Sequence, residues 1–299
     1  MLYTEMIPAQ ALWHGKQEAF LSHDAAERPV AAQLGGSDPE QLRLGARLAQ
    51  AWGYDEVNLN IGCPSDRVQS GRFGACLMAE PMLVAELVAA MREACSLPVT
   101  VKTRIGIDDQ DSESDLLDFI AAIRDAGCEA VIIHARKAWL KGLNPKQNRE
   151  IPPLRYDRVR LVKSHFPDLE VIINGGVTDL DQAAALLADF DGVMMGRAAY
   201  HDPYLLAHAD QRIFGDDGRR VPDRHEILEA YIPYMADQLE RGVRLSHMTR
   251  HILGLFQGVP GARRWRRYLS ENAHTREAGI DVVRAAAECV QRAPTRVSA

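Results

Sequence analysis

The apolar positions of this chain fall into short continuous runs that alternate with segments of helical periodicity. A run of about four to eight apolar residues bounded by turn residues is typical of a strand covered on both faces. Seven such runs are predicted to be strands: residues 2–5, 30–34, 56–60, 99–103, 130–134, 170–174 and 192–196.

Helical spacing fills the intervals between these strands, at residues 39–51, 81–95, 114–126, 154–165 and 180–187. Several of these segments open with Asp, Ser or Pro, which are preferred at helix starts. A repeated strand–helix unit with apolar strands predicts a parallel sheet, and the number of strands favours a (β/α)8 TIM barrel over an open sheet. Because the count is seven, one strand of the barrel is expected to be missing.

The alternation stops near residue 218, and the rest of the chain has helical patterning. Helices are expected over residues 224–240, 246–255, 262–270 and 279–292, with a Gly/Pro break at 258–261. We therefore predict two domains, a TIM-barrel domain over residues 1–218 and a small all-helical domain over residues 219–299.

Composition narrows the class of protein. The chain has 299 residues, of which 46% are hydrophobic and 25% charged, enough for one large α/β domain and a small second one. No apolar run approaches the roughly 18 residues of a membrane span, and no charged-then-apolar leader is present, so a cytoplasmic protein is expected. The five cysteines are scattered, without a C-x-x-C pair, and no structural metal is expected.

The net charge of −6 is distributed unevenly along the chain. Residues 219–299 hold fourteen basic residues, all arginine, and nine acidic ones, whereas residues 1–218 hold 21 basic and 32 acidic residues. Arginine favours bidentate contact with phosphate and stacking on bases, so the basic segment is a candidate RNA-binding surface. A genome-wide preference for arginine over lysine would produce the same composition.

A cysteine lies where the predicted strand 56–60 ends. Asn58 and Asn60 belong to this buried strand, and each amide needs a hydrogen-bond partner there. Cys63 follows in a Gly/Pro turn at the strand end, the edge at which barrel enzymes build their active sites. Cys63 is therefore a candidate catalytic residue, and a half-buried structural cysteine is the alternative.

The run Asn-Leu-Asn-Ile-Gly-Cys-Pro at 58–64, continued by Gly-Arg-Phe-Gly-Ala-Cys-Leu-Met at 71–78, resembles the active-site segment of the tRNA-dihydrouridine synthases. The resemblance covers essentially the whole chain, and residues 134–143 and 148–153 resemble the A-type bacterial subfamily. It implies that Cys63 donates a proton to a uracil. The family's first strand, with a segment of the type Ala-Pro-Met, has no counterpart here, so the resemblance also implies that this strand is absent.

Several strand ends carry residues suited to a flavin. A lysine at a barrel mouth, such as Lys102, can hold the negative charge of a reduced flavin, although it can also merely end a strand. Glycine-containing turns after the last two strands are where this fold binds phosphate groups. The resemblance implies FMN contacts at Gln33, Lys102, His134, Asn174, Gly175, Gly176, Gly196 and Arg197.

The resemblance implies an FMN-dependent oxidoreductase that reduces the C5=C6 bond of uridines in the tRNA D-loop, at positions 20 and 20a. NADPH is the expected reductant, with NAD(P)+ as the acceptor in the reverse direction. A thiol with an unperturbed pKa of about 8.5 is protonated at neutral pH and can act as the acid. Contacts with tRNA are expected at Asn60, Lys146, Arg149, Arg264 and Arg267, and no membrane or obligate protein partner is expected.

Two other functions fit parts of the pattern. An FMN barrel that reduces a free pyrimidine could use the same cysteine turn and glycine loops, although it would have no use for the arginine-rich helical segment. An RNA-binding protein without catalysis would follow if the missing strand abolished flavin binding. Flavin absorbance of the purified protein would distinguish this last alternative from the two enzymes.

Overall fold

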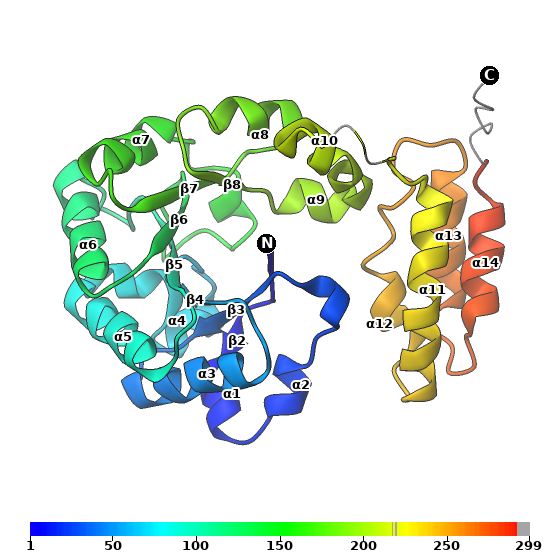
Figure 1. Ribbon diagram of the computed structural model, residues 1–299, viewed down its shortest axis with the longest axis horizontal. Coiled ribbons are helices and arrows are strands. Elements are labelled where there is room, and N and C mark those ends of the chain that lie inside the picture. The colour runs from blue at the N-terminus through cyan, green and yellow to red at the C-terminus, as the bar shows by residue number, and fades with distance from the viewer. Residues whose placement is uncertain (217, 219, 292–299) are drawn as a thin grey trace. The chain divides into compact units, whose positions relative to one another are not determined.

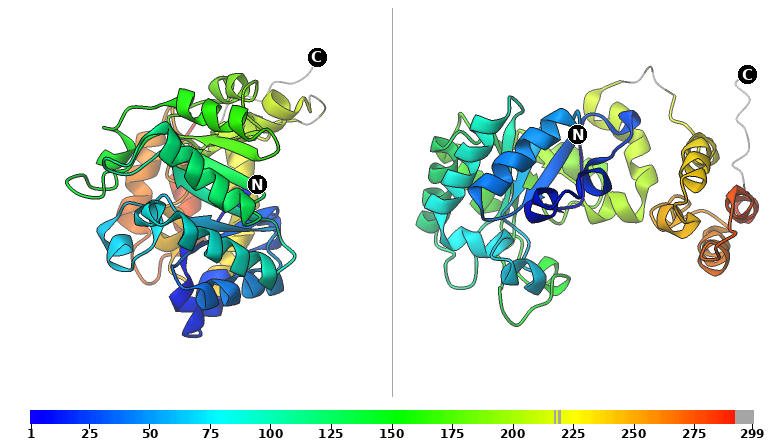
Figure 2. Two further views of the ribbon diagram at one scale, coloured as in Figure 1. Left: turned by 90° about the vertical axis from the view of Figure 1, so that its left-hand side faces the viewer. Right: turned by 90° about the horizontal axis from the view of Figure 1, so that it is seen from below.

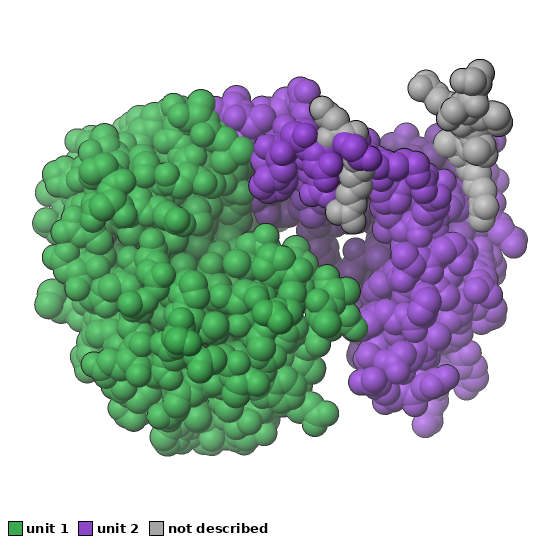
Figure 3. Space-filling model, viewed as in Figure 1, with its two compact units in different colours: residues 1–176, 186–194 green, residues 177–185, 195–299 purple. Residues whose placement is uncertain are grey.

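The computed structural model describes residues 1–216, 218 and 220–291. These residues form two compact units, which Figure 3 distinguishes by colour. The first unit comprises residues 1–176 and 186–194, and the second comprises residues 177–185 and 195–299. The two units are defined by contacts between residues, and the domain boundary at residue 218 stays a prediction.

The first unit is built on one curved parallel sheet, which is prominent in Figure 1. Its path follows chain order from β1 to β8, and β2 pairs with β3 outside that path. The strands are β1 (Leu2–Tyr3), β2 (Ile7–Pro8), β3 (Val30–Gly35), β4 (Glu56–Asn60), β5 (Val99–Arg104), β6 (Ala130–His134), β7 (Glu170–Asn174) and β8 (Gly192–Met194). Every predicted strand is thus present, and parallel pairing throughout confirms the predicted sheet type.

The first predicted strand, residues 2–5, is interrupted. Leu2 is paired with Val30 and Ile7 with Leu34, so five steps along the edge chain match four along β3. One extra residue therefore bulges out between β1 and β2. The hydroxyl of Thr4 fills the gap in the ladder, because the backbone N–H of Gln33 donates to Thr4 Oγ1 at 3.0 Å.

The sheet is open between its first and last strands. Within residues 1–216, 218 and 220–291, no strand pairing joins β8 to β1 or β2. Because β1 and β2 lie along the same edge of β3, the sheet has seven positions around its curve, as the sequence predicted. This arrangement is that of a TIM barrel with one position of the sheet unfilled.

Helices cover the outer face of this sheet. The first unit contains α1 (Ala9–Trp13), α2 (Gln17–Leu21), α3 (Pro39–Ala51), α4 (Asp66–Ser70), α5 (Pro81–Ala94), α6 (Glu113–Asp125) and α7 (Tyr156–His165). The helices α3, α5, α6 and α7 pack against one another in chain order. The predicted start of α3 is confirmed, because Asp38 caps the helix by accepting from the backbone N–H of Gln41 and Pro39 is its first residue.

The second unit contains the remaining helices, although the last residue of α8, Leu186, belongs to the first unit. They are α8 (Leu180–Leu186), α9 (Arg197–His201), α10 (Ala209–Phe214), α11 (Arg224–Glu240), α12 (Leu245–Thr249), α13 (Ala262–Asn272) and α14 (Ile280–Glu288). Helices α11, α13 and α14 lie side by side in Figures 1 and 2. Their apolar faces enclose a core centred on Trp265, which is fully buried and packs edge-on against Phe256. The last helix ends at Glu288, earlier than expected, and the predicted end at residue 292 lies outside the described residues.

The helix predicted over residues 246–255 is shorter in the structure. The helix α12 ends at Thr249 and gives way to tight turns such as Leu255 N–H to Ile252 O. The reason is a close approach within the second unit, since a Cβ at Gly254 would overlap the carbonyl oxygen of His201. Short 3-10 turns occupy Ala25–Glu27, Gly74–Ala79, Gln147–Arg149 and Pro203–His208. Among the described residues, no helix is both long and apolar enough to cross a membrane.

Candidate active site

The polar strand ends predicted from the sequence lie on five consecutive strands, β3 to β7. Asn60 on β4 is paired in register with Lys102 on β5, and His134 on β6 with Asn174 on β7. Gln33 on β3 pairs with Asn58, two residues before Asn60. Because all pairs are parallel, these side chains gather at one edge of the sheet.

The amide of Asn60 shapes the turn that carries Cys63. Its Oδ1 accepts hydrogen bonds from the backbone N–H groups of Gly62, at 3.1 Å, and Cys63, at 3.0 Å. The thiol itself is half-buried, and its Sγ lies 3.5 Å from Ser65 Oγ. The turn thus holds the Cys63 backbone at the strand end and leaves the thiol accessible.

Gly74 closes the other side of this turn. Its φ of +75° lies in the left-handed region that favours glycine, and a Cβ there would lie 2.6 Å from the carbonyl oxygen of Cys63. The same carbonyl accepts from the backbone N–H of Ala75 at 2.9 Å. A side chain at position 74 would therefore clash with the cysteine turn, which explains why glycine occupies this position. The sequence alone does not reveal this contact.

The amides that the sequence analysis required to be paired form one hydrogen-bond chain. Asn60 Nδ2 donates to Gln33 Oε1 at 2.7 Å, and Gln33 Nε2 donates to Asn58 Oδ1 at 2.8 Å. The chain continues from Asn58 Nδ2 to Thr100 Oγ1 at 2.8 Å, and from that hydroxyl to Glu56 Oε1 at 2.6 Å. Asn58 is fully buried, so this chain removes the cost of placing an amide in the core.

Lys102 points toward the next strands at the same edge. Its Nζ donates to Asn174 Oδ1 at 3.1 Å, and Asn174 Nδ2 donates to the Met194 carbonyl at 2.8 Å. Burial, reinforced by the nearby Arg104 charge and opposed by Cys63, lowers the pKa of Lys102 to about 8. Keeping Lys102 charged at this position therefore costs free energy, which is typical of a group that binds an anionic ligand.

Arg104 belongs to the site although the sequence analysis did not select it. Its guanidinium is 4% exposed and donates to three backbone carbonyls, those of Gly62 at 2.9 Å, Asn148 at 3.0 Å and Lys137 at 3.2 Å. Burial lowers its pKa to about 10. One signal was available, because residues 102 and 104 of a strand share a face.

Two loops are joined beside Cys63. We call residues 61–73 the cysteine loop and residues 137–149 the basic loop. Arg104 joins them through Gly62 and Lys137, and Gln69 joins them a second time by donating to Pro64 O at 2.9 Å and to Leu140 O at 2.8 Å. Gln69 was also not selected from the sequence, because both of its acceptors are backbone atoms.

The basic loop is built around Asn148, which is fully buried. Asn148 exchanges two hydrogen bonds with the backbone of Trp139 and donates to Leu143 O at 3.1 Å. Of the two predicted tRNA contacts that flank it, Lys146 is exposed and Arg149 is half-buried. The loop therefore has an ordered interior and a basic outer surface.

Two glycines follow β7 with left-handed backbones, Gly175 at φ +106° and Gly176 at φ +77°. A Cβ at Gly175 would lie 3.1 Å from His134 Nε2, so the histidine ring lies against this turn. The Tyr156 hydroxyl donates to Gly175 O at 2.6 Å and fixes the turn from the other side. Burial raises the pKa of Tyr156, which keeps this donor protonated.

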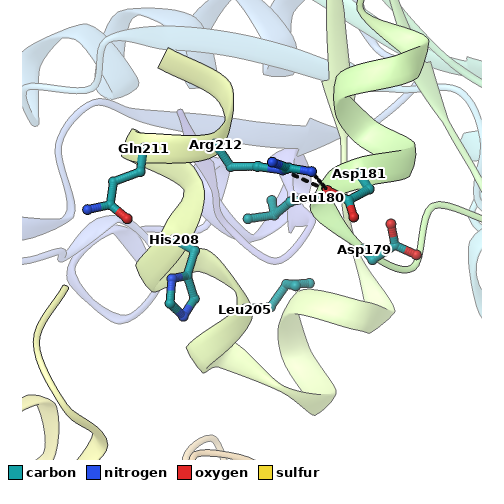
Figure 4. A pocket seen from close by; sticks show the side chains of 7 residues that line it. All are labelled: Asp179, Leu180, Asp181, Leu205, His208, Gln211 and Arg212. Carbon is teal, nitrogen blue, oxygen red and sulfur yellow. Dashed lines mark hydrogen bonds and ion pairs between the residues drawn. The ribbon is translucent and has the colours of Figure 1, made fainter. Parts of the chain in front are cut away.

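Gly196 and Arg197 belong to the second unit, at the start of α9, and both are exposed. Their cooperation with Gly175 and Gly176 at one phosphate group stays a prediction. The second unit also contains a groove between α8 and α10, in which Arg212 Nε donates to Asp181 Oδ1 at 2.7 Å (Figure 4). That groove contains none of the predicted site residues.

The arginine cluster lies on α13. Ala262, Trp265 and Leu269 form its buried stripe, so the arginines occupy the remaining surface. Arg263, Arg264 and Arg267 are exposed, and Arg267 pairs with Glu271 at 3.0 Å. Of these three, Arg263 and Arg264 make no ion pair with any described residue.

Comparison with known proteins agrees with this geometry. A family model described as "Dihydrouridine synthase (Dus)" matches residues 1–293. A "tRNA-dihydrouridine(20/20a) synthase" of Shewanella oneidensis is 57% identical over 291 residues, covering 97% of this chain and 86% of the relative. Proteins with the same name from Vibrio parahaemolyticus and Escherichia coli K12 are 58% identical (95% and 86% covered) and 56% identical (97% and 84% covered). The chain belongs to the dihydrouridine synthase family, whose members are flavin-dependent oxidoreductases.

Proposed function

We propose that this protein reduces uridines 20 and 20a of tRNA to 5,6-dihydrouridine, with FMN as its flavin and NADPH as the reductant. The observation that carries the proposal is the Asn60 turn, which holds Cys63 at the edge where Lys102 also lies. The positions come from the names of the relatives, and a tRNA substrate is the reason to expect the activity in the cytoplasm.

The residues present fit a flavin. Gly175 and Gly176 leave a backbone turn without side chains beside His134, into which a Cβ would intrude. Lys102 offers a cation, and Gln33 retains one N–H and one oxygen lone pair after its two hydrogen bonds. These are the contacts required by a ring system with a pyrimidine edge that becomes anionic on reduction.

The protein's part in the reaction is binding, orientation and proton transfer. When bound, the reduced flavin supplies the hydride that adds to C6 of the uracil. The Cys63 thiol gives its proton to C5, so that the two additions saturate the C5=C6 bond. Asn60 has one N–H left after its three hydrogen bonds, and this donor can orient a uracil carbonyl.

The uridine has to leave the stacked tRNA before it reaches Cys63, which costs about a few kcal/mol. Phosphate contacts offset this cost, and we assign them to Lys146 and Arg149 on the basic loop and to Arg264 and Arg267 on α13. A reductase of free pyrimidines would need none of these residues. The relatives' names likewise favour tRNA over a free base, and they favour an enzyme over a non-catalytic RNA-binding protein.

The test compares Cys63→Ala with the unchanged protein on an unmodified tRNA transcript. We expect the variant to keep its flavin and its reduction by NADPH and to lose at least about a hundredfold in dihydrouridine formation, since general acid catalysis contributes about that much. Mass spectrometry of the tRNA and stopped-flow flavin absorbance measure the two reactions separately. Normal dihydrouridine yield in the variant would exclude Cys63 as the acid.

A further inference from the structure

The buried hydrogen-bond chain behind Cys63 ends at a carboxylate that the proposed reaction does not use. Glu56 lies at the opposite end of β4 from Asn60 and is 8% exposed. We propose that Glu56 and Thr100 are positioning residues, which anchor the far end of this series of amides and so keep Gln33, Asn60 and the cysteine loop in place. This inference rests on the proposed function, because those two amides are the ones assigned to flavin and uracil.

The direction in which these hydrogen bonds run is determined at both ends of the series. The backbone N–H groups of Gly62 and Cys63 can only donate, so Asn60 has to present its oxygen to them. At the other end, the Glu56 carboxylate accepts from the Thr100 hydroxyl. A hydroxyl has one proton to give, so Thr100 has to accept from the neighbour on its other side.

Each amide between these ends then has a single orientation. Asn60 turns its nitrogen to the oxygen of Gln33, Gln33 turns its nitrogen to the oxygen of Asn58, and the Asn58 nitrogen reaches Thr100. In each of these bonds a donor faces a lone pair, and the four consecutive bonds of 2.6–2.8 Å run in one direction. Without the acceptor at Glu56, Thr100 and Asn58 are no longer held in this order, and Gln33 loses a fixed acceptor for its Nε2 group.

Tyr3 strengthens the anchor, because its hydroxyl also donates to Glu56 Oε1 at 2.8 Å. Burial, followed by the charge of Glu56, raises the pKa of Tyr3, which remains a donor at all physiological pH values. Glu56 Oε1 thus accepts hydrogen bonds from two hydroxyl groups, which hold the carboxyl group in place.

The test uses matched variants that differ only in hydrogen bonding. Thr100→Val keeps the shape of the side chain but removes the hydroxyl, and Thr100→Ser restores it. Glu56→Met removes the acceptor, and Glu56→Gln retains an oxygen for Thr100 and Tyr3. Thr103→Val is the control, because Thr103 is equally buried on β5 but its hydroxyl only contacts the carbonyl of Arg104.

The first measurement is the rate at which iodoacetamide alkylates Cys63, followed by mass spectrometry of its peptide. Cys95, also half-buried, is measured in the same samples to correct for general loosening. We expect Thr100→Val and Glu56→Met to raise the Cys63 rate relative to Cys95 by about fivefold, the factor that corresponds to one net hydrogen bond. Thr100→Ser, Glu56→Gln and Thr103→Val should stay within about twofold of the unchanged protein.

The second measurement is the FMN dissociation constant of the flavin-free protein, from quenching of flavin fluorescence. The same two variants should weaken it several-fold through Gln33, and Thr100→Ser and Glu56→Gln should restore it. Equal alkylation of Cys63 in all variants would overturn the positioning role, and so would parallel changes at Cys63 and Cys95. If the unchanged protein formed no dihydrouridine, the proposed function would fail, whereas the alkylation comparison would still decide this inference.

Discussion

Two requirements on the Lys102 side chain conflict with each other. Its ammonium group has to stay at the strand edge to meet an anion, yet burial there disfavours its charge and lowers its pKa to about 8. The Asn174 oxygen accepts a hydrogen bond from this ammonium group, but a neutral amide compensates a charge only partly. A free lysine amine would be protonated to about pH 10.4.

This conflict predicts a pH dependence of stability. Between about pH 8 and pH 10.5 the unfolded chain holds the Lys102 proton more tightly than the folded one, so the stability contribution of Lys102 rises with pH across this window. Below pH 8 the burial cost is fully present. Flavin-free Lys102→Met should therefore gain stability over the unchanged protein at pH 7, and this gain should shrink by up to about 3 kcal/mol towards pH 10.5.

Urea unfolding of both proteins at pH 7 and pH 10 measures this difference. The comparison of two proteins is needed because burial raises the pKa of Tyr54 and of Cys128 to about 12 each, and these groups make both proteins less stable in alkali. Parallel pH profiles for the two proteins would show that the ammonium group of Lys102 is solvated in the folded state.

At the scale of elements, the sequence predicted what depends on local signals. The start of α3 followed from Asp38 and Pro39, and the strand ends followed from apolar runs that stop at a polar residue. The bulge at Thr4 could not be predicted, because it depends on a hydroxyl that replaces a backbone partner across the sheet. Arg104 and Gln69 were missed for a related reason, since each of them donates to a carbonyl of a loop distant in sequence.

Gln69 gives the joined loops a testable consequence. Gln69→Ala removes the bonds to Pro64 and Leu140 but leaves the Arg104 connection intact. We expect trypsin to cleave after the exposed Lys141 several-fold faster, because one of the links between the two loops is removed. Dihydrouridine formation should fall by about fivefold to tenfold as Cys63 loses its fixed position, and NADPH-driven flavin reduction should be unchanged.

Gln50→Ala is the matched control for this experiment. Gln50 also bridges two segments, since its Oε1 accepts from the backbone N–H of Ser96 at 2.6 Å, but it contacts neither loop. Its cleavage after Lys141 should match the unchanged protein. Equal cleavage in Gln69→Ala and Gln50→Ala would mean that Arg104 alone holds the loops together.

At the scale of the whole molecule, charge is divided between an acidic and a basic part of the chain. Residues 1–218 hold an excess of acidic residues, and residues 219–299 hold fourteen arginines against nine acidic residues. The acidic excess of residues 1–218 repels RNA in general, so productive binding depends on local basic surfaces. On α13, the pair Arg267–Glu271 is exposed and contributes about 0.3–0.5 kcal/mol to the helix.

Arg263 and Arg264 make no ion pair with a described residue, so we expect them to contribute more to phosphate contact on α13 than Arg267 does. Each neutralised phosphate releases counterions, so the double variant Arg263→Ala with Arg264→Ala should raise the tRNA dissociation constant and flatten its salt dependence by roughly one unit of slope for each phosphate that is no longer neutralised. Arg267→Ala should have a smaller effect, because Glu271 already offsets its charge. Binding measured between about 50 and 200 mM salt gives the slope.

Arg284→Ala serves as the control, because Arg284 is an exposed arginine of α14 in the same unit. If general charge alone attracts tRNA, each single substitution of an arginine should change the slope equally, wherever it lies. If α13 contacts phosphates, Arg284→Ala should leave the slope unchanged, and NADPH-driven flavin reduction should be normal in every variant. An unchanged slope in the double variant would mean that the arginines of α13 face solvent and do not contact tRNA. The basic loop would then be the only proposed tRNA contact outside the Cys63 turn.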